Sequence, residues 1–299
     1  MCGIVGLFAK DPGIESELGA HLAVMLASLS DRGPDSAGFA VYAPAVAGAV
    51  KLTLRAPAGF DFSELAARLA PHVQGDIGLT PRGTHAVLAV PTAQQAQARA
   101  ALRDLAPEIV IVGAGERMEL YKEVGRPERV VQEFHLDKMT GSHGVGHTRM
   151  ATESAVTTDG AHPYSTGLDQ CLVHNGSLSN HNAVRRGLRH LGYAFATEND
   201  TEVAAAYLSA RIAAGESLDD ALRQSMQDLD GFFTFVVGTH SGFAVLRDPI
   251  ACKPAVMAET GRYVAFGTEY RALVDLPDIE QARVWEPEPA TVYSWDRRQ

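Results

Sequence analysis

The sequence contains few cysteines, and their spacing matches no disulfide or metal motif. Among 299 residues there are three, Cys2, Cys171 and Cys252, with no CxxC pair and no metal-ligand spacing relative to the histidines. We therefore expect no metal site in this chain. Such sparse cysteine use is typical of a reducing compartment, and it predicts a cytoplasmic protein.

Long apolar runs and basic segments are also missing. No apolar stretch approaches the ~18 residues of a membrane span, and the N-terminus lacks the basic region of a signal peptide. The net charge of −10 disfavours nonspecific binding to nucleic acid or to anionic membranes. No phosphate loop or flavin signature is present, so we expect no cofactor in this chain.

The composition and the periodicity predict a packed globular protein. Hydrophobic residues make up 46% of the sequence and charged residues 21%. Strands and helices alternate from about residue 43 to 140, which predicts a small α/β subdomain inserted into a larger body. Further helices are expected at 15–29, 180–191, 200–214 and 218–229, and strands at 232–239, 243–247, 255–258, 263–268 and 291–295.

The first residues combine a nucleophile with a possible base. Cys2 follows Met1, and a small residue at this position normally allows removal of the initiator methionine. Cys2 would then carry a free α-amine, which titrates near pH ~8, beside its own thiol. Such an amine could take the thiol proton, as covalent catalysis requires. The alternative is an unreactive cysteine that happens to precede an edge strand.

Two other polar positions allow both a structural and a functional interpretation. Asn175-Gly176 between apolar runs is a strong hairpin signal, but an Asn amide and a Gly N–H are also suitable oxyanion donors. Asn199 and Glu202 have the spacing of a helix N-cap and its partner. Asp200 would then lie in the first helical turn, where it could stabilise the helix or bind a substrate ammonium.

Several short motifs occur together in a familiar order. They are Cys2-Gly3-Ile4-Val5-Gly6, Arg32-Gly33-Pro34-Asp35-Ser36-Ala37-Gly38, His147-Thr148-Arg149, Ala161-His162-Pro163, Val173-His174-Asn175-Gly176, Asn199-Asp200-Thr201-Glu202, Arg247-Asp248-Pro249 and Phe266-Gly267-Thr268-Glu269. With them the chain resembles a class II glutamine amidotransferase of the N-terminal nucleophile hydrolase type. It is most similar to the separate glutaminase-like subunit of glutamate-synthase-like enzymes, the N-methylglutamate synthase group.

The resemblance implies a fold and a catalytic centre. The fold would be α+β, a four-layer αββα sandwich over residues 2–299 with the block 43–140 inserted in it. Cys2 would attack the side-chain amide of glutamine and form a thioester, with its own α-amine as general base. Asn175 and the N–H of Gly176 would stabilise the oxyanion.

The resemblance also implies a substrate site. Arg149 would pair with the α-carboxylate of glutamine, where a two-pronged donor is a natural match, and Thr152 would assist it. Asp200 would take the α-ammonium group. Arg32 and His162 would support the site, although ordinary turn chemistry alone could also account for Arg32.

One difference from the family pattern follows Arg149. Several members carry an aromatic residue directly after this arginine and a histidine after the threonine, whereas this chain has Met150 and Glu153. Glu153 would bring negative charge close to the proposed carboxylate site.

The resemblance implies partners as well. We expect the length to leave no room for a synthase domain, so ammonia would pass to a flavin-dependent synthase subunit with its companion. FMN and iron–sulfur clusters would belong to those partners. The alternatives are a non-hydrolytic subunit that binds an amino acid, a free-standing glutaminase, and a scaffold without activity.

Overall fold

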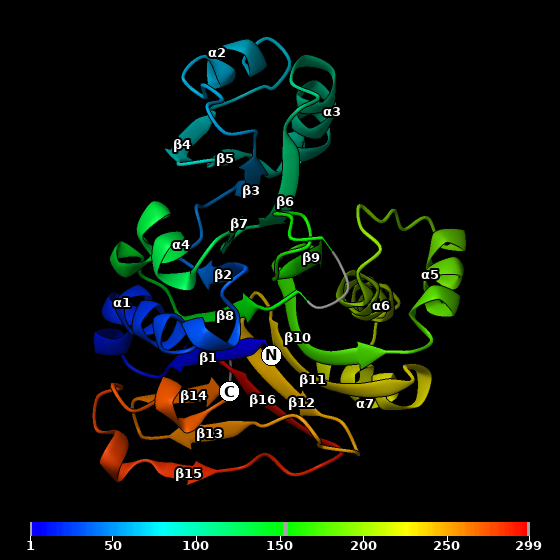
Figure 1. Ribbon diagram of the computed structural model, residues 1–299. Coiled ribbons are helices and arrows are strands. Elements are labelled where there is room, and N and C mark those ends of the chain that lie inside the picture. The colour runs from blue at the N-terminus through cyan, green and yellow to red at the C-terminus, as the bar shows by residue number, and fades with distance from the viewer. Residues whose placement is uncertain (1, 152–154, 298–299) are drawn as a thin grey trace.

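The computed structural model describes residues 2–151 and 155–297, and within them the chain forms three antiparallel sheets (Figure 1). The largest sheet has seven strands in the order β15-β13-β14-β1-β8-β2-β7. Their bounds are Arg283–Trp285, Val256–Glu259, Tyr263–Gly267, Gly3–Ala9, His143–Arg149, Ser36–Tyr42 and Met118–Val124. The N-terminal strand β1 is therefore central, and all seven of its residues are buried.

A second sheet of five strands faces the first. Its order is β16-β12-β11-β10-β9. The bounds are Thr291–Asp296, Gly242–Arg247, Gly231–Gly238, Gln170–Leu178 and Tyr164–Gly167. The inner faces of both sheets enclose one apolar cluster that includes Ile4, Val145, Val173 and Phe243.

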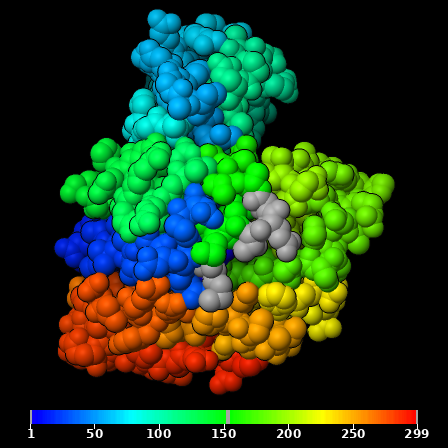
Figure 2. Space-filling model, in the orientation of Figure 1, coloured from blue at the N-terminus to red at the C-terminus, as the bar shows by residue number. Residues whose placement is uncertain are grey.

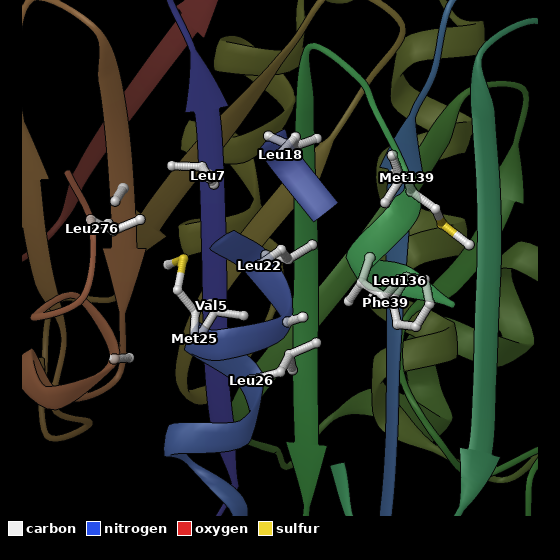
Figure 3. Packing of buried hydrophobic residues seen from close by; sticks show 14 of the residues in the cluster. Val5, Leu7, Leu18, Leu22, Met25, Leu26, Phe39, Leu136, Met139 and Leu276 are labelled. Atoms are coloured by element: carbon white, nitrogen blue, oxygen red, sulfur yellow. The ribbon is translucent and has the colours of Figure 1, made fainter. Parts of the chain in front are cut away.

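Helices cover the outer faces of both sheets. On the seven-stranded sheet they are α1 (Pro12–Ser28) and α4 (Pro127–Glu133), and on the five-stranded sheet α5 (His181–His190), α6 (Asp200–Ala213) and α7 (Leu218–Asp228). Figure 3 shows Leu22 and Leu26 of α1 above the sheet, beside Val5 and Leu7 of β1. The layers are therefore helix, sheet, sheet, helix, and the predicted αββα sandwich is confirmed.

Glycines in β8 allow α1 to approach the sheet closely. A β-carbon at Gly144 or Gly146 would lie 2.9 Å from a methyl carbon of Leu22 or Leu26. The start of α1 is fixed by Asp11, whose side chain accepts a hydrogen bond from the Ile14 amide over 2.9 Å. The predicted helix at 15–29 therefore begins three residues earlier, with Pro12 in its first turn.

The block 43–140 divides between two sheets. Four strands form a separate sheet in the order β4-β5-β3-β6, with α2 (Leu65–Leu69) and α3 (Gln95–Leu105) on one face. Their bounds are Gly78–Arg82, His85–Pro91, Ala49–Arg55 and Val110–Gly115. This βαββαβ arrangement has the ferredoxin-like strand order, and it projects from the body as a lobe (Figure 2).

The end of the block belongs to the main body instead. β7 pairs with β2 along seven residue pairs, and α4 packs beside α1. We predicted no strand for β4 or β7. β4 is short, exposed and contains Pro81, which is typical of an edge strand, while β7 carries Glu119, Lys122 and Glu123.

The remaining predictions for the second half of the chain agree closely with the structure. α5, α6 and α7 start and end within one or two residues of the predicted helices, and β11, β12, β13, β14 and β16 match the predicted strands equally well. No helix in the described part of the chain is both long and apolar enough to cross a membrane.

Candidate active site

Cys2 lies at the end of the central strand, where the two sheets meet. Gly3 pairs with Thr148 of β8, so Cys2 lies beside the end of that strand. The carbonyl oxygen of Cys2 accepts hydrogen bonds from Arg32 Nε over 3.1 Å and from Asn175 Nδ2 over 3.3 Å. Its thiol is oriented toward the carbonyl oxygen of Met150, 3.8 Å away. Side chains from two other parts of the chain thus hold the Cys2 backbone.

Asn175 and Gly176 lie inside a strand and form no hairpin turn. Both belong to β10, where Asn175 pairs with Thr234 and Gly176 with Phe233 of β11. Gly176 has a φ of +150°, and a β-carbon there would lie 1.9 Å from the Phe232 carbonyl oxygen. The hairpin interpretation is therefore wrong, because the positive φ of Gly176 is accommodated within a continuous ladder.

Thr268 fixes the amide of Asn175. The Asn175 Nδ2 donates to Thr268 Oγ1 over 3.2 Å, and the same hydroxyl oxygen accepts from the Ile4 amide over 2.7 Å. Thr268 follows β14, which pairs with β1, so the contact links both sheets close to Cys2. We had quoted Thr268 within a motif without assigning it a role.

Arg149 is the last residue of β8, and it is only 6% exposed. Its backbone pairs with Ser36 of β2, and its carbonyl accepts from the Asp35 amide over 3.1 Å. The Asp35 carboxylate in turn accepts from the Ala151 amide over 2.8 Å. The Gly- and Pro-rich segment around Asp35 therefore positions the chain on both sides of Arg149.

Asp200 is the first residue of α6, and Asn199 caps this helix. The Asn199 side chain accepts from the Thr201 amide over 2.8 Å, as predicted for an N-cap. The predicted partner Glu202 accepts from the Ala196 and Thr197 amides instead of the Asn199 amide, so this part of the prediction is wrong. Asp200 Oδ2 accepts from the Leu178 amide over 3.0 Å, and its Oδ1 lies 3.6 Å from His174 Nδ1. Burial raises the pKa of this carboxyl, but His174 and the Leu178 amide outweigh it and lower the pKa to about 2.

Thr201 joins two buried histidines to Asp200. Its hydroxyl oxygen lies 2.8 Å from His162 Nε2 and 3.0 Å from His174 Nδ1, and it donates to Asp200 Oδ1 over 3.4 Å. A hydroxyl has a single proton, so when Thr201 donates it to Asp200 Oδ1, both imidazoles must donate to the Thr201 oxygen. His162 also stacks on His147, with ring centres 4.0 Å apart. Burial lowers the pKa of His162 and holds it neutral.

Arg32 lies behind Cys2 in an ion pair. It belongs to a short 3₁₀ turn, Ser30–Arg32, and its guanidinium contacts the carboxylate of Glu269. Arg271 Nε holds the other oxygen of Glu269 over 2.6 Å. Turn chemistry alone therefore does not account for Arg32, because its side chain bonds to the Cys2 backbone.

One cavity of about 670 Å³ brings the predicted residues together. Seven of the eight predicted site residues line it: Cys2, Arg32, Arg149, His162, Asn175, Gly176 and Asp200. Thr152 lies outside the described residues, as does Glu153. Met150 lines the cavity and is 37% exposed.

Several lining residues had been given no role from the sequence, although some of them belong to the family motifs. They are His174, Ser177, His181, Thr197, Glu198, Thr201, Lys253 and Pro254, among others. His174 and Thr201 directly adjoin the predicted Asn175 and Asp200, so their position in the motifs could have identified them. Among the described residues no group of three or more His, Cys, Asp or Glu side chains is arranged to hold a metal ion.

Comparisons with known proteins identify the relatives of this chain. The family described as "Glutamine amidotransferase domain" matches residues 147–275. A "Glutamine amidotransferase-like protein GlxB" from Rhizobium meliloti (strain 1021) is 61% identical over 303 residues, which cover 100% of this chain and 99% of that protein. A "Putative glutamine amidotransferase" from Methanothermobacter thermautotrophicus is 31% identical, over 98% of this chain and 99% of the relative.

A solved structure shows the same fold. Glutamine phosphoribosylpyrophosphate amidotransferase from B. subtilis superimposes with a TM-score of 0.64 at 20% identity, over 99% of this chain and 48% of that one. This chain thus spans about half the length of that enzyme. From the two relatives that match it over their full lengths, the chain belongs to the class II glutamine amidotransferase family.

Proposed function

We propose that this chain is the glutaminase subunit of a glutamate-synthase-like complex of the N-methylglutamate synthase group. It hydrolyses the side-chain amide of glutamine through a thioester on Cys2. The observation that carries the proposal is the convergence of Cys2, Asn175, Arg149 and Asp200 on one cavity. A nucleophile, an oxyanion donor, a cation and an anion are what hydrolysis of an α-amino acid amide requires.

The nucleophile is the Cys2 thiolate, after removal of Met1. The α-amine takes the thiol proton through a water molecule, and sulfur adds to the amide carbon. The tetrahedral intermediate collapses when the C–N bond breaks, and the nitrogen leaves as ammonia with that proton. Water then adds to the thioester, which releases glutamate and restores the thiol.

The oxyanion is stabilised by Asn175 and Gly176. Both hydrogens of the Asn175 amide are in use, on Cys2 O and on Thr268 Oγ1. Donation to an oxyanion therefore replaces the bond to Cys2 O, while Arg32 Nε keeps its own bond to that carbonyl oxygen. Thr268 holds the Asn175 side chain in the meantime.

Glutamine is oriented by two opposite charges. Arg149 offers a planar fork to the α-carboxylate, with Thr152 assisting. Asp200 meets the α-ammonium, and its pKa of about 2 keeps it ionised at neutral pH. Arg32 and His162 touch neighbouring groups and act as supports.

The ammonia passes to a partner. In glutamine–fructose-6-phosphate aminotransferases the segment similar to this chain covers about a fifth of the relative, for example 21% in Thermococcus kodakarensis. By analogy we propose a separate flavin-dependent synthase subunit and a companion, with FMN and iron–sulfur clusters in those partners. This chain binds none of them.

Mass spectrometry of the intact protein tests the proposal. We expect the purified chain to lack Met1 and to gain one equivalent of a glutamine-mimicking electrophile at Cys2, and excess glutamine should protect it. Modification of Cys171 or Cys252 instead, or retention of Met1 in a protein that releases ammonia, would contradict the mechanism. Co-purification from the native cell tests the partner, and migration of the chain alone with full turnover would favour a free-standing glutaminase.

A further inference from the structure

The loop 157–161 forms one wall of the cavity beside Arg149. Thr157 and Gly160 line the cavity, and His162 follows them. A β-carbon at Gly160 would lie 3.2 Å from Nη1 of Arg149, so the loop backbone contacts the guanidinium. A shift of the loop would therefore change the position or the freedom of this side chain.

Lys122 of β7 forms hydrogen bonds with the backbone of this loop. It is 5% exposed, and its Nζ donates to the carbonyl oxygens of Asp159 over 3.2 Å and Ala161 over 2.8 Å. The Tyr164 hydroxyl also donates to Asp159 O over 3.0 Å, and Lys122 Nζ lies 4.4 Å from the centre of the Tyr164 ring. A buried ammonium is costly unless its donors are used, and here they are used on the loop.

The four-stranded sheet also contacts the loop. Arg55 of β3 forms an ion pair with Asp159, with 2.5 Å between Nη2 and Oδ1, and its side chain is 18% exposed. Glu123 of β7 accepts from the Thr158 hydroxyl and, over 3.0 Å, from the Thr84 hydroxyl beside β5. Two contacts thus connect the projecting lobe to the wall of the cavity.

Lys51 provides a direct comparison within the same interface. It lies on β3, is 6% exposed, and bonds to Glu119 of β7 over 2.8 Å. Lys51 therefore joins the lobe to the body, as Arg55 does. The contacts of the Lys51 ammonium in the described structure are with Glu119 and the Pro44 carbonyl, and neither belongs to the loop 157–161.

We propose that Lys122 and Arg55 are positioning residues that fix the loop 157–161 against Arg149. Through Arg55 the inserted lobe thereby influences the affinity of the cavity for an α-carboxylate, while Lys122 acts from the main body. The inference rests on the proposed function, in which Arg149 binds the carboxylate of glutamine.

The test compares Lys122→Met and Asp159→Asn with the matched control Lys51→Met. For the first two we expect a rise in KM for glutamine of about tenfold, with kcat changed less than about twofold, because only ground-state orientation is lost. Lys51→Met should leave KM within about twofold even where it lowers Tm. Hydrogen exchange should become faster at 157–161 in Lys122→Met and remain unchanged there in Lys51→Met.

The outcomes separate this inference from the proposed function. An equal rise of KM in Lys51→Met and Lys122→Met would show that any loss of packing at this interface has the same effect, and it would overturn the inference. If Lys122→Met does not fold, Arg55→Gln and Asp159→Asn decide, since both side chains are partly exposed. The inference is also overturned if the KM for glutamine rises in Arg149→Lys but stays at the wild-type value in Lys122→Met and Asp159→Asn. A KM unchanged in Arg149→Lys overturns the carboxylate role itself.

Discussion

The side-chain amide of Asn175 donates a hydrogen bond to the carbonyl oxygen of Cys2 over 3.3 Å. The two residues are 173 positions apart in sequence, and they come from the two facing sheets. The proposed oxyanion donor therefore lies directly at the nucleophile before any substrate is bound. Donation to an oxyanion requires that the amide leave the Cys2 carbonyl oxygen while it keeps its bond to Thr268 Oγ1.

Loss of the Asn175 amide should affect turnover far more than folding. We expect Asn175→Ala to lower kcat by about 10²–10³, the usual effect of one oxyanion donor. The matched control is Thr234→Val. Thr234 lies on β11 directly opposite Asn175, and its buried hydroxyl oxygen has no hydrogen-bond partner among the described residues. Its kcat should stay within about twofold of wild type. A large loss of Tm in Asn175→Ala with normal turnover per folded molecule would contradict the assignment.

Arg149→Lys should be costly although the charge is kept. Lysine cannot offer the planar fork that matches a carboxylate, so kcat/KM for glutamine should fall, mainly through KM. Steady-state ammonia release measures this change. Arg117→Lys is a useful control, because Arg117 is a partly buried arginine that bonds to the Ala43 carbonyl and the Ser142 hydroxyl, away from the cavity. Equal KM values for Arg149→Lys and wild type would remove Arg149 from the substrate site.

Buried histidines should make the protein less stable in acid. Burial is the main cause that lowers the pKa of His85, His143 and His147 to about 3, from an ordinary value near ~6.5. Between these values the unfolded chain binds more protons than the folded one, so stability rises with pH and is complete above pH ~6.5. Each histidine changes the free energy of unfolding by at most about 1.4 kcal/mol per pH unit in this window.

His85→Phe tests this effect at one site. His85 packs against Phe134 and Tyr121, so a phenyl ring suits the same surroundings. Tm measured from pH 7 to pH 4.5 should fall less steeply in this variant than in wild type. An identical slope would show that His85 does not titrate between the folded and unfolded states.

The sequence predicted the site better than it predicted the surroundings of the site. Cys2, Arg149, Asn175 and Asp200 could be identified because each lies in a short motif, and three of them, Cys2, Arg149 and Asp200, lie at the end of a strand or helix. Asn175-Gly176 taken alone favoured a turn, because local signals do not show that a strand continues through a glycine with positive φ. The family resemblance, rather than the local pattern, pointed to a site residue, and the structure places Asn175 in a continuous strand beside Cys2.

The polar interface beneath the lobe could not be predicted. Lys51, Arg55 and Lys122 are buried or mostly buried, although their types are normally exposed. Their burial depends on partners from distant segments, such as Glu119 and Asp159, and no periodicity reveals such pairs. For the same reason β7, with its charged residues Glu119, Lys122 and Glu123, was not predicted as a strand.

The most direct test of the account is the rate of ammonia release from glutamine by the wild-type chain and by Cys2→Ala, measured side by side. The account predicts glutamine-dependent release by the wild type and none above background by Cys2→Ala, because no other group here is proposed to form the thioester. A matched Cys252→Ala variant, which changes an exposed cysteine outside the cavity, should keep the wild-type rate. Equal rates for Cys2→Ala and wild type would contradict the central claim.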